Sequence, residues 1–192
     1  MHDQIVQWVK EIVDLEQRIE QELEQGQQAF RYRFNKSRVQ FEQEVVESQR
    51  QLKVSVLQRL KKAKIGTLLS VPIIYGLAIP LLLADLSVFI YQWSCFTLWG
   101  VARVRRRDYW VMDRQQLAYL NWLERINCFY CSYANGLAAY FREVAARTEQ
   151  YWCPIKHARK VQQPHARYWH FSDYGDAAAY REQLQQFRDE LR

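Results

Sequence analysis

Cysteine and histidine side chains cluster near the C-terminal end of the chain. One cysteine and three of the four histidines lie in one short segment: Cys153, His157, His165 and His170. Thiolate and imidazole groups suit zinc and other late first-row metals. We therefore expect a zinc site in this loop. Asp173 and Asp176 are expected to complete it as ligands or to orient a ligating imidazole.

A second pair of thiols, Cys128 and Cys131, has the CxxC spacing of metal and redox sites. Together with Cys153 and His157 they spell C-x2-C-x21-C-x3-H, which is a permissible zinc ligand set. An intervening helix would separate the pair from Cys153 by about 25–30 Å. A shared site therefore requires a broken helix or two copies of the chain. The alternative is that the thiols pack between helices and the histidines rest at a membrane surface.

The motifs of the common enzyme classes are absent from the sequence. It contains no Ser-His-Asp pattern, glycine-rich phosphate loop, dinucleotide fingerprint or Glu-x-x-His di-iron motif. Glu143, Glu149, Arg142 and Arg147 are most simply explained as ion pairs along a helix. We expect no catalytic residues. Nucleic acid is not an expected partner either, because the net charge of +6 is accompanied by no nucleic-acid-binding motif.

The most apolar part of the chain lies between Ile65 and Val104. Two uncharged runs, 65–84 and 86–102, flank Asp85. Each run has about the 17–20 residues that cross a hydrocarbon core. Because a carboxylate is costly at mid-bilayer, Asp85 is expected at a turn between two helices. This pattern predicts a transmembrane hairpin. A shallow re-entrant hairpin and a buried hairpin in a soluble protein are the alternatives.

Basic residues flank the apolar block on both sides. They are Arg59, Lys61, Lys62 and Lys64 before it and Arg103, Arg105, Arg106 and Arg107 after it. Since cytoplasmic loops are enriched in Lys and Arg, both termini are expected in the cytoplasm, at the inner membrane. Anionic lipid headgroups are expected partners of these clusters. The acidic, amphipathic first 25 residues do not resemble a cleavable signal peptide.

Residues 4–62 are expected to form one long amphipathic helix, with a break near Gly26 as the alternative. Its apolar residues recur at helical spacing. They are Ile5, Val9, Ile12, Ile19, Leu23, Phe30, Phe34, Phe41, Val45, Leu52, Val56 and Leu60. A narrow stripe on a long helix is typical of a coiled-coil seam. The seam would pack against a second copy, another protein or the C-terminal part of the same chain.

Two helices are expected after the apolar block. Asp113 is the expected N-cap of the first, and Pro154 is expected to end the second. Asn135-Gly136 either forms a turn between them or lies inside one continuous helix. A closing helix is expected from about Ala177 to Leu191. The stretch from Asn121 to Asp176, with INCFYCSYANG, AARTEQYWCPIKHARK and HFSDYGDA, resembles a family of bacterial membrane proteins. The resemblance covers less than a third of the chain and implies no activity.

The sequence therefore predicts a mainly α protein with three consecutive parts. Residues 1–64 form an amphipathic, coiled-coil-like helix, residues 65–104 a membrane hairpin, and residues 105–192 a cytoplasmic helical domain with the Cys/His-rich loop. Two functions fit this layout. The first is a membrane-anchored accessory protein that binds zinc. The second is a non-catalytic scaffold or assembly factor that recruits a partner, or a second copy, through residues 4–62.

Overall fold

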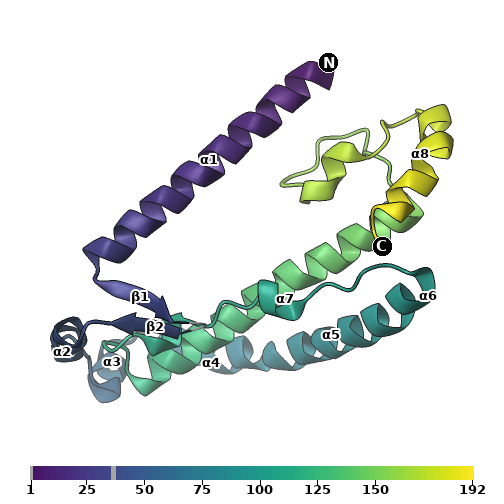
Figure 1. Ribbon diagram of the computed structural model, residues 1–192. Coiled ribbons are helices and arrows are strands. Elements are labelled where there is room, and N and C mark those ends of the chain that lie inside the picture. Colours follow the sequence, from purple (N-terminus) through teal and green to yellow (C-terminus); the bar gives the residue numbers. More distant parts are fainter. Residues whose placement is uncertain (1, 36–37) are drawn as a thin grey trace. The chain divides into compact units, whose positions relative to one another are not determined.

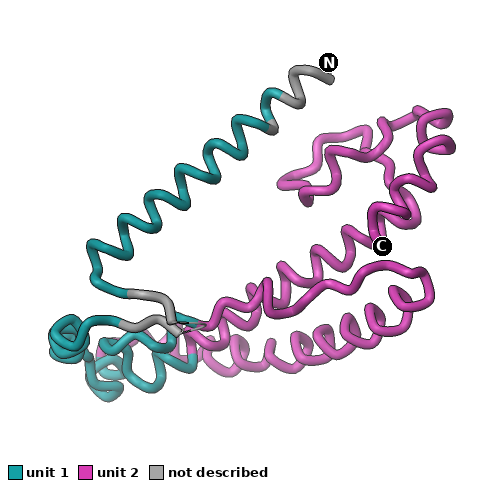
Figure 2. The backbone as a smooth tube through the Cα atoms, viewed as in Figure 1, with its two compact units in different colours: residues 1–61, 113–126 teal, residues 62–112, 127–192 magenta. Residues whose placement is uncertain are grey.

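The computed structural model describes residues 2–35 and 38–192, and it is mainly helical (Figure 1). The chain divides into two compact units, each built from two separate stretches (Figure 2). Unit 1 comprises residues 1–61 and 113–126, and unit 2 comprises residues 62–112 and 127–192. Of the predicted N-terminal stripe, Ile5, Val9 and Phe34 have side chains outside the described part.

Unit 1 contains a long helix, a small hairpin and two short helices. These are α1 (His2–Ala29), β1 (Tyr32–Asn35), β2 (Arg38–Phe41), α2 (Gln43–Gln51) and α3 (Val56–Lys62). A 3-10 turn, η3 (Arg114–Gln116), belongs to its second stretch. The two stretches are joined where Asn121 donates a hydrogen bond to the backbone oxygen of Val54, at 3.0 Å, and where Arg59 pairs with Glu124.

The predicted continuous helix over residues 4–62 is wrong beyond Ala29. Arg31 has a positive φ of 52°, which stops the helix. After it, aromatic and β-branched residues recur at every second position, the period of a strand. The strands pair antiparallel with Tyr32 opposite Phe41, and their ring centroids lie 5.4 Å apart. The hairpin therefore replaces the middle of the expected helix.

Unit 2 begins with a nearly unbroken apolar helix. It consists of α4 (Ile65–Gly76), α5 (Ala78–Tyr91), the π-helical turn η1 (Gln92–Phe96) and α6 (Thr97–Trp99). Together they form one helix of 35 residues, Ile65–Trp99, which is long and apolar enough to cross a membrane. We call it the apolar helix. The predicted turn at Asp85 is wrong, because Asp85 lies inside α5. The helix ends at Gly100, whose φ of 71° favours glycine.

An extended connector, residues 100–112, then runs back along the apolar helix. It contains the 3-10 turn η2 (Arg106–Asp108). Val101 and Val104 of the connector are buried in a core with Val88, Phe96, Leu137, Tyr140 and Val144. The connector therefore lies between the apolar helix and the next helix, and it supplies part of the core to both.

The long helix α7 (Trp122–Trp152) follows. Asn121, rather than the predicted Asp113, caps it. Its side chain accepts from the backbone N–H of Glu124 at 3.0 Å, and the Glu124 carboxylate accepts from the N–H of Asn121 at 2.9 Å. Asn135-Gly136 lies within this one continuous helix, and the predicted end before Pro154 is confirmed.

Within unit 2, α7 runs in the same direction as the apolar helix (Figure 1). Tyr130 donates to the backbone oxygen of Ile74 at 2.8 Å, and further along both helices the hydroxyls of Tyr91 and Thr148 lie 2.9 Å apart. The remaining elements are η4 (Ala166–His170) and the closing helix α8 (Ala177–Asp189). The closing helix confirms the prediction from the sequence.

Gly136 marks the closest approach of α7 to the connector. A Cβ atom at this position would lie 2.9 Å from the backbone oxygen of Tyr109 and 3.1 Å from the Trp110 ring. Gly136→Ala is therefore expected to lower the thermal midpoint of unit 2, although Ala is favoured over Gly by about 1 kcal/mol in an unhindered helix. Gly76→Ala is the control, because nothing lies within 4 Å of its added Cβ. Thermal melts that rank Gly136→Ala at or above the parent would contradict the close packing.

Candidate functional site

The charged and amide side chains in the second half of the apolar helix face the protein interior. Asp85 and Gln92 are buried, with 9% and 6% of their surface exposed. They are seven residues apart and so lie on one side of the helix. Val88 and Phe96, on the same side, are buried with them. The inward face of this helix therefore combines Asp85 and Gln92 with apolar core residues.

Asp85 forms an ion pair with Arg106 of the connector and accepts a hydrogen bond from Tyr133 of α7. Its Oδ2 atom accepts from the Arg106 guanidinium at 2.6 Å and from the Tyr133 hydroxyl at 2.8 Å. The guanidinium also lies 4.7 Å from the centre of the Trp110 ring. Burial, followed by the hydrogen bond to Asp85, raises the pKa of Tyr133 to about 12. Tyr133 therefore stays protonated and remains a donor to the carboxylate.

Gln92 forms hydrogen bonds with both backbone groups of Val104 in the connector. Its side-chain oxygen accepts from the Val104 N–H at 2.7 Å. Its side-chain nitrogen donates to the Val104 backbone oxygen at 3.3 Å and to the Tyr140 hydroxyl at 3.0 Å. A buried backbone N–H and C=O must find partners, and an extended segment has none of its own. The amide thus takes the place of a neighbouring strand.

The opposite face of the apolar helix is apolar and exposed. Leu82, Leu83, Leu86, Phe89, Ile90 and Trp93 each have between 48% and 61% of their surface exposed. We call these six side chains the outer face. The nearby hydroxyls of Ser87, Ser94 and Thr97 donate to backbone oxygens four residues earlier, at 2.7, 2.8 and 2.6 Å. Because each hydroxyl proton is already donated within the helix, these side chains do not require a water molecule as hydrogen-bond acceptor.

This arrangement reverses that of a helix on the surface of a soluble protein. There the apolar stripe faces the core and the polar side chains face water. Here Asp85 and Gln92 face inward while the outer face is apolar. A continuous exposed apolar surface of this kind marks a site for a membrane or a protein partner.

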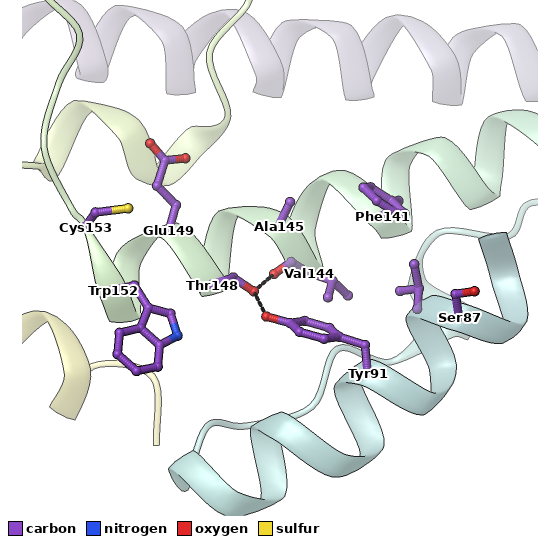
Figure 3. Close-up of a pocket in the computed structure, with 10 residues that line it drawn as sticks. Ser87, Tyr91, Phe141, Val144, Ala145, Thr148, Glu149, Trp152 and Cys153 are labelled. Carbon is purple, nitrogen blue, oxygen red and sulfur yellow. Dashed lines mark hydrogen bonds between the residues drawn. The ribbon is translucent and has the colours of Figure 1, made fainter.

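An apolar groove of about 510 Å³ lies beside the outer face, between α5 and α7. Its walls include Val88, Phe141, Val144 and Ala145. Figure 3 shows the paired hydroxyls of Tyr91 and Thr148 within it, Ser87 and Phe141 towards one end, and Trp152, Glu149 and Cys153 towards the other. Ligand sites combine apolar walls with a few polar groups in this manner.

Cys153 is a weak nucleophile at neutral pH. Burial, followed by the negative charge of Glu149, raises the pKa of its thiol above the usual value. The raised pKa makes the thiol a poorer nucleophile, because the attacking species is the thiolate. Glu149 itself lies 3.0 Å from the Nε2 atom of His165.

Of the other residues predicted for the zinc site, His157, His165, Asp173 and Asp176 have partners within the protein. The His165 ring packs on Phe171 with centroids 5.5 Å apart, and His157 stacks on Tyr168 at 6.2 Å. His170 lies at the end of η4. Asp173 pairs with Lys156 at 2.8 Å, and Asp176 caps α8 by accepting from the N–H of Ala179 at 2.9 Å.

Among the side chains that the structure describes, no three from His, Cys, Asp or Glu gather as an ion site requires. Cys128 and Cys131 lie in α7, while Cys153 follows its end. The continuous helix keeps the CxxC pair away from Cys153. Zinc binding by the loop therefore stays a prediction from the sequence, and metal analysis of the purified protein tests it.

Arg167 holds the loop to α7, a role that the sequence analysis missed. It donates to Glu143 at 2.9 Å and to Gln150 at 2.9 Å, and Arg147 donates to the same Glu143 oxygen at 2.9 Å. Burial raises the pKa of Glu143, but the hydrogen bonds from Arg147 and Arg167 outweigh it, so the pKa lies below its usual value. Only the Glu143–Arg147 pair has the helical spacing visible in the sequence.

Comparisons with known proteins give no relative. No protein family, curated protein or solved structure matches this chain.

Proposed function

We propose that the protein is a non-catalytic membrane scaffold that lies in the membrane surface, with its outer face in the lipid. The reversed apolar helix carries this proposal. Leu86 and Trp93 are exposed while Asp85 and Gln92 are buried. Transferring a Leu or Phe side chain from water to an apolar phase contributes about 1.5–3 kcal/mol. Lipid is the apolar phase that covers the outer face without requiring a matching protein surface.

The contacts of the apolar helix favour an in-plane orientation over a crossing one. Arg106 and the extended backbone of the connector pack along its second half. Extended backbone is tolerated in the hydrocarbon region only where protein covers it, and residues 102, 103 and 105–108 of the connector are exposed. In the first half, Tyr75 pairs with Asn127, and Tyr130 binds the backbone oxygen of Ile74. A crossing orientation would bring these groups to mid-membrane. An in-plane helix buries one face by about 5–10 Å and leaves the other face in water.

Exposed cations at both ends of the apolar helix support the same orientation. Lys62 and Lys64 precede it, and Arg103 follows it. Each cation near an anionic surface contributes about 1 kcal/mol. A membrane rich in anionic lipid, such as the cytoplasmic leaflet of an inner membrane, is therefore the proposed location.

The groove extends the lipid-facing surface. Ser87, which lines it, neighbours Leu83 and Ile90 of the outer face on the helix surface, at i−4 and i+3. A groove that opens beside lipid and has apolar walls suits one acyl chain of a membrane lipid. We propose that a lipid chain occupies it when the protein is bound to the membrane.

The experiment that tests the proposal determines which side of a sealed membrane each part of the chain faces. An in-plane helix leaves the residues before and after it on the same side, whereas a single crossing places them on opposite sides. Residues Glu24 and Glu182 are both exposed and report on the two parts. We expect both to face the cytoplasm.

A further inference from the structure

The helix α1 has an exposed apolar stripe of its own. Trp8, Ile12, Leu15 and Ile19 have between 53% and 60% of their surface exposed. The flanking residues are mostly acidic: Glu11, Asp14, Glu16, Glu20 and Glu24, against Lys10 and Arg18. An acidic helix is repelled by an anionic membrane. The stripe on α1 therefore calls for a protein partner.

The spacing of this stripe is that of a coiled coil. Ile12 and Ile19 are seven residues apart and occupy the a positions of a heptad, and Trp8 and Leu15 occupy the d positions. The apolar seam ends at Ile19, because the next d and a positions hold Glu22 and Gly26. We propose that α1 pairs with α1 of a second copy of this chain in an antiparallel, two-stranded coiled coil.

Charge determines the antiparallel orientation. In this heptad Glu11 and Arg18 occupy g positions and Glu16 an e position. A parallel pair places the g residue of one helix opposite the e residue of the other, so that Glu11 would face Glu16. An antiparallel pair places g opposite g, so that Glu11 of each copy faces Arg18 of the other. Residues at e and g set partner and orientation in coiled coils.

The apolar layers agree with this orientation. When Glu11 faces Arg18, Ile12 of one helix packs against Leu15 of the other, and Trp8 packs against Ile19. Each of these residues is exposed in a single copy. Arg18 also pairs with Asp14 of its own helix at 2.8 Å. That pair lies one turn along the same helix and leaves further donors of the guanidinium for Glu11 of the second copy.

Reversing the charges tests this proposal. The full chain is purified in detergent, and its dimer dissociation constant is measured by sedimentation in density-matched solvent. Glu11→Arg and Arg18→Glu each replace two attractive pairs in the dimer with two repulsive ones. An exposed pair contributes about 0.2–1 kcal/mol, so each variant is expected to weaken the dimer by about tenfold. The double variant, Glu11→Arg with Arg18→Glu, restores the pairing and should dimerise like the parent.

Glu24→Arg is the matched control, because position 24 lies away from the seam and should leave the dissociation constant within about twofold. Ile12→Asp places a charge in the seam and should give monomers. Tighter dimerisation of Glu11→Arg would show a parallel pair, with the introduced guanidinium facing Glu16, and would overturn the proposal. A monomeric parent would also overturn the proposal, because the stripe would then bind another partner. So would a double variant whose dimer dissociation constant is no lower than those of the single variants.

Discussion

Replacing Leu86 and Trp93 with glutamate is expected to release the protein from the membrane. Both side chains belong to the outer face, one on each side of its middle, and both are more than half exposed. Placing a carboxylate in the apolar part of a membrane costs about 2–3 kcal/mol or more, in addition to the lost burial of the original side chain. The double variant should therefore bind vesicles at least about 10³-fold more weakly than the parent.

The matched control is the double variant Gln162→Glu with Gln183→Glu. It changes the net charge by the same amount at two exposed positions away from the outer face. Flotation with vesicles that contain anionic lipid measures both variants. Circular dichroism should show the same helix content in both, since the replaced side chains point away from the core. A membrane-bound Leu86→Glu, Trp93→Glu variant would contradict a lipid contact at this face.

Asp85→Asn is expected to destabilise unit 2 by about 2 kcal/mol. The carboxylate accepts hydrogen bonds from Arg106 and Tyr133, and a hydrogen bond to a charged group contributes about 1.5–3 kcal/mol. The Arg106 side chain is 43% exposed, so water replaces part of the lost interaction and the cost stays below that of a fully buried pair. Denaturant unfolding measures the change.

The double variant Asp85→Asn with Arg106→Gln should be less destabilised than the sum of its single variants, because the two charges act as a pair. Asp189→Asn is the control. It removes a carboxylate that pairs with Arg192 at the surface, where ion pairs contribute little. An Asp85→Asn variant as stable as the parent would mean that the Asp85–Arg106 pair does not hold the connector in place.

The positions of the apolar helix and of the closing helix could be predicted, because local patterns determine them. A long uncharged run predicts the first, and Gly175-Asp176 predicts the start of the second, where Asp176 caps α8. Pro154 marked the end of α7 for a similarly local reason, since proline cannot continue a helix.

The turn at Asp85 was predicted because a carboxylate without a partner would be costly inside an apolar helix. Its partner is Arg106, twenty-one residues later, and it becomes a neighbour only when the connector returns along the helix. No spacing rule links these two positions. The structural role of Gln92 was missed for the same reason. Its side chain pairs with the backbone of Val104, which lies twelve residues later and comes near only when the connector returns along the helix.

The composition of the Cys/His-rich loop did not reveal which contacts order it. Its histidines pack on Tyr168 and Phe171, and Arg167 ties the loop to Glu143 of α7. These contacts order the loop through side chains that neither the predicted zinc site nor the alternative of histidines at a membrane surface had included. Arg167, Tyr168 and Phe171 follow Pro164 in a loop, where no periodic spacing in the sequence identifies their contacts.

The measurement that tests the in-plane orientation most directly is labelling of single cysteines by a membrane-impermeant reagent. The four native cysteines are replaced by serine, and cysteine is introduced at Glu24, Ser87 or Glu182 in turn. In sealed vesicles of known orientation, positions 24 and 182 should react from the same, cytoplasmic side, and position 87 from neither side, because lipid covers it. Labelling of 24 and 182 from opposite sides would show a crossing helix. Labelling of 87 from the far side would show a hairpin. Either result would contradict a helix that lies in the membrane surface.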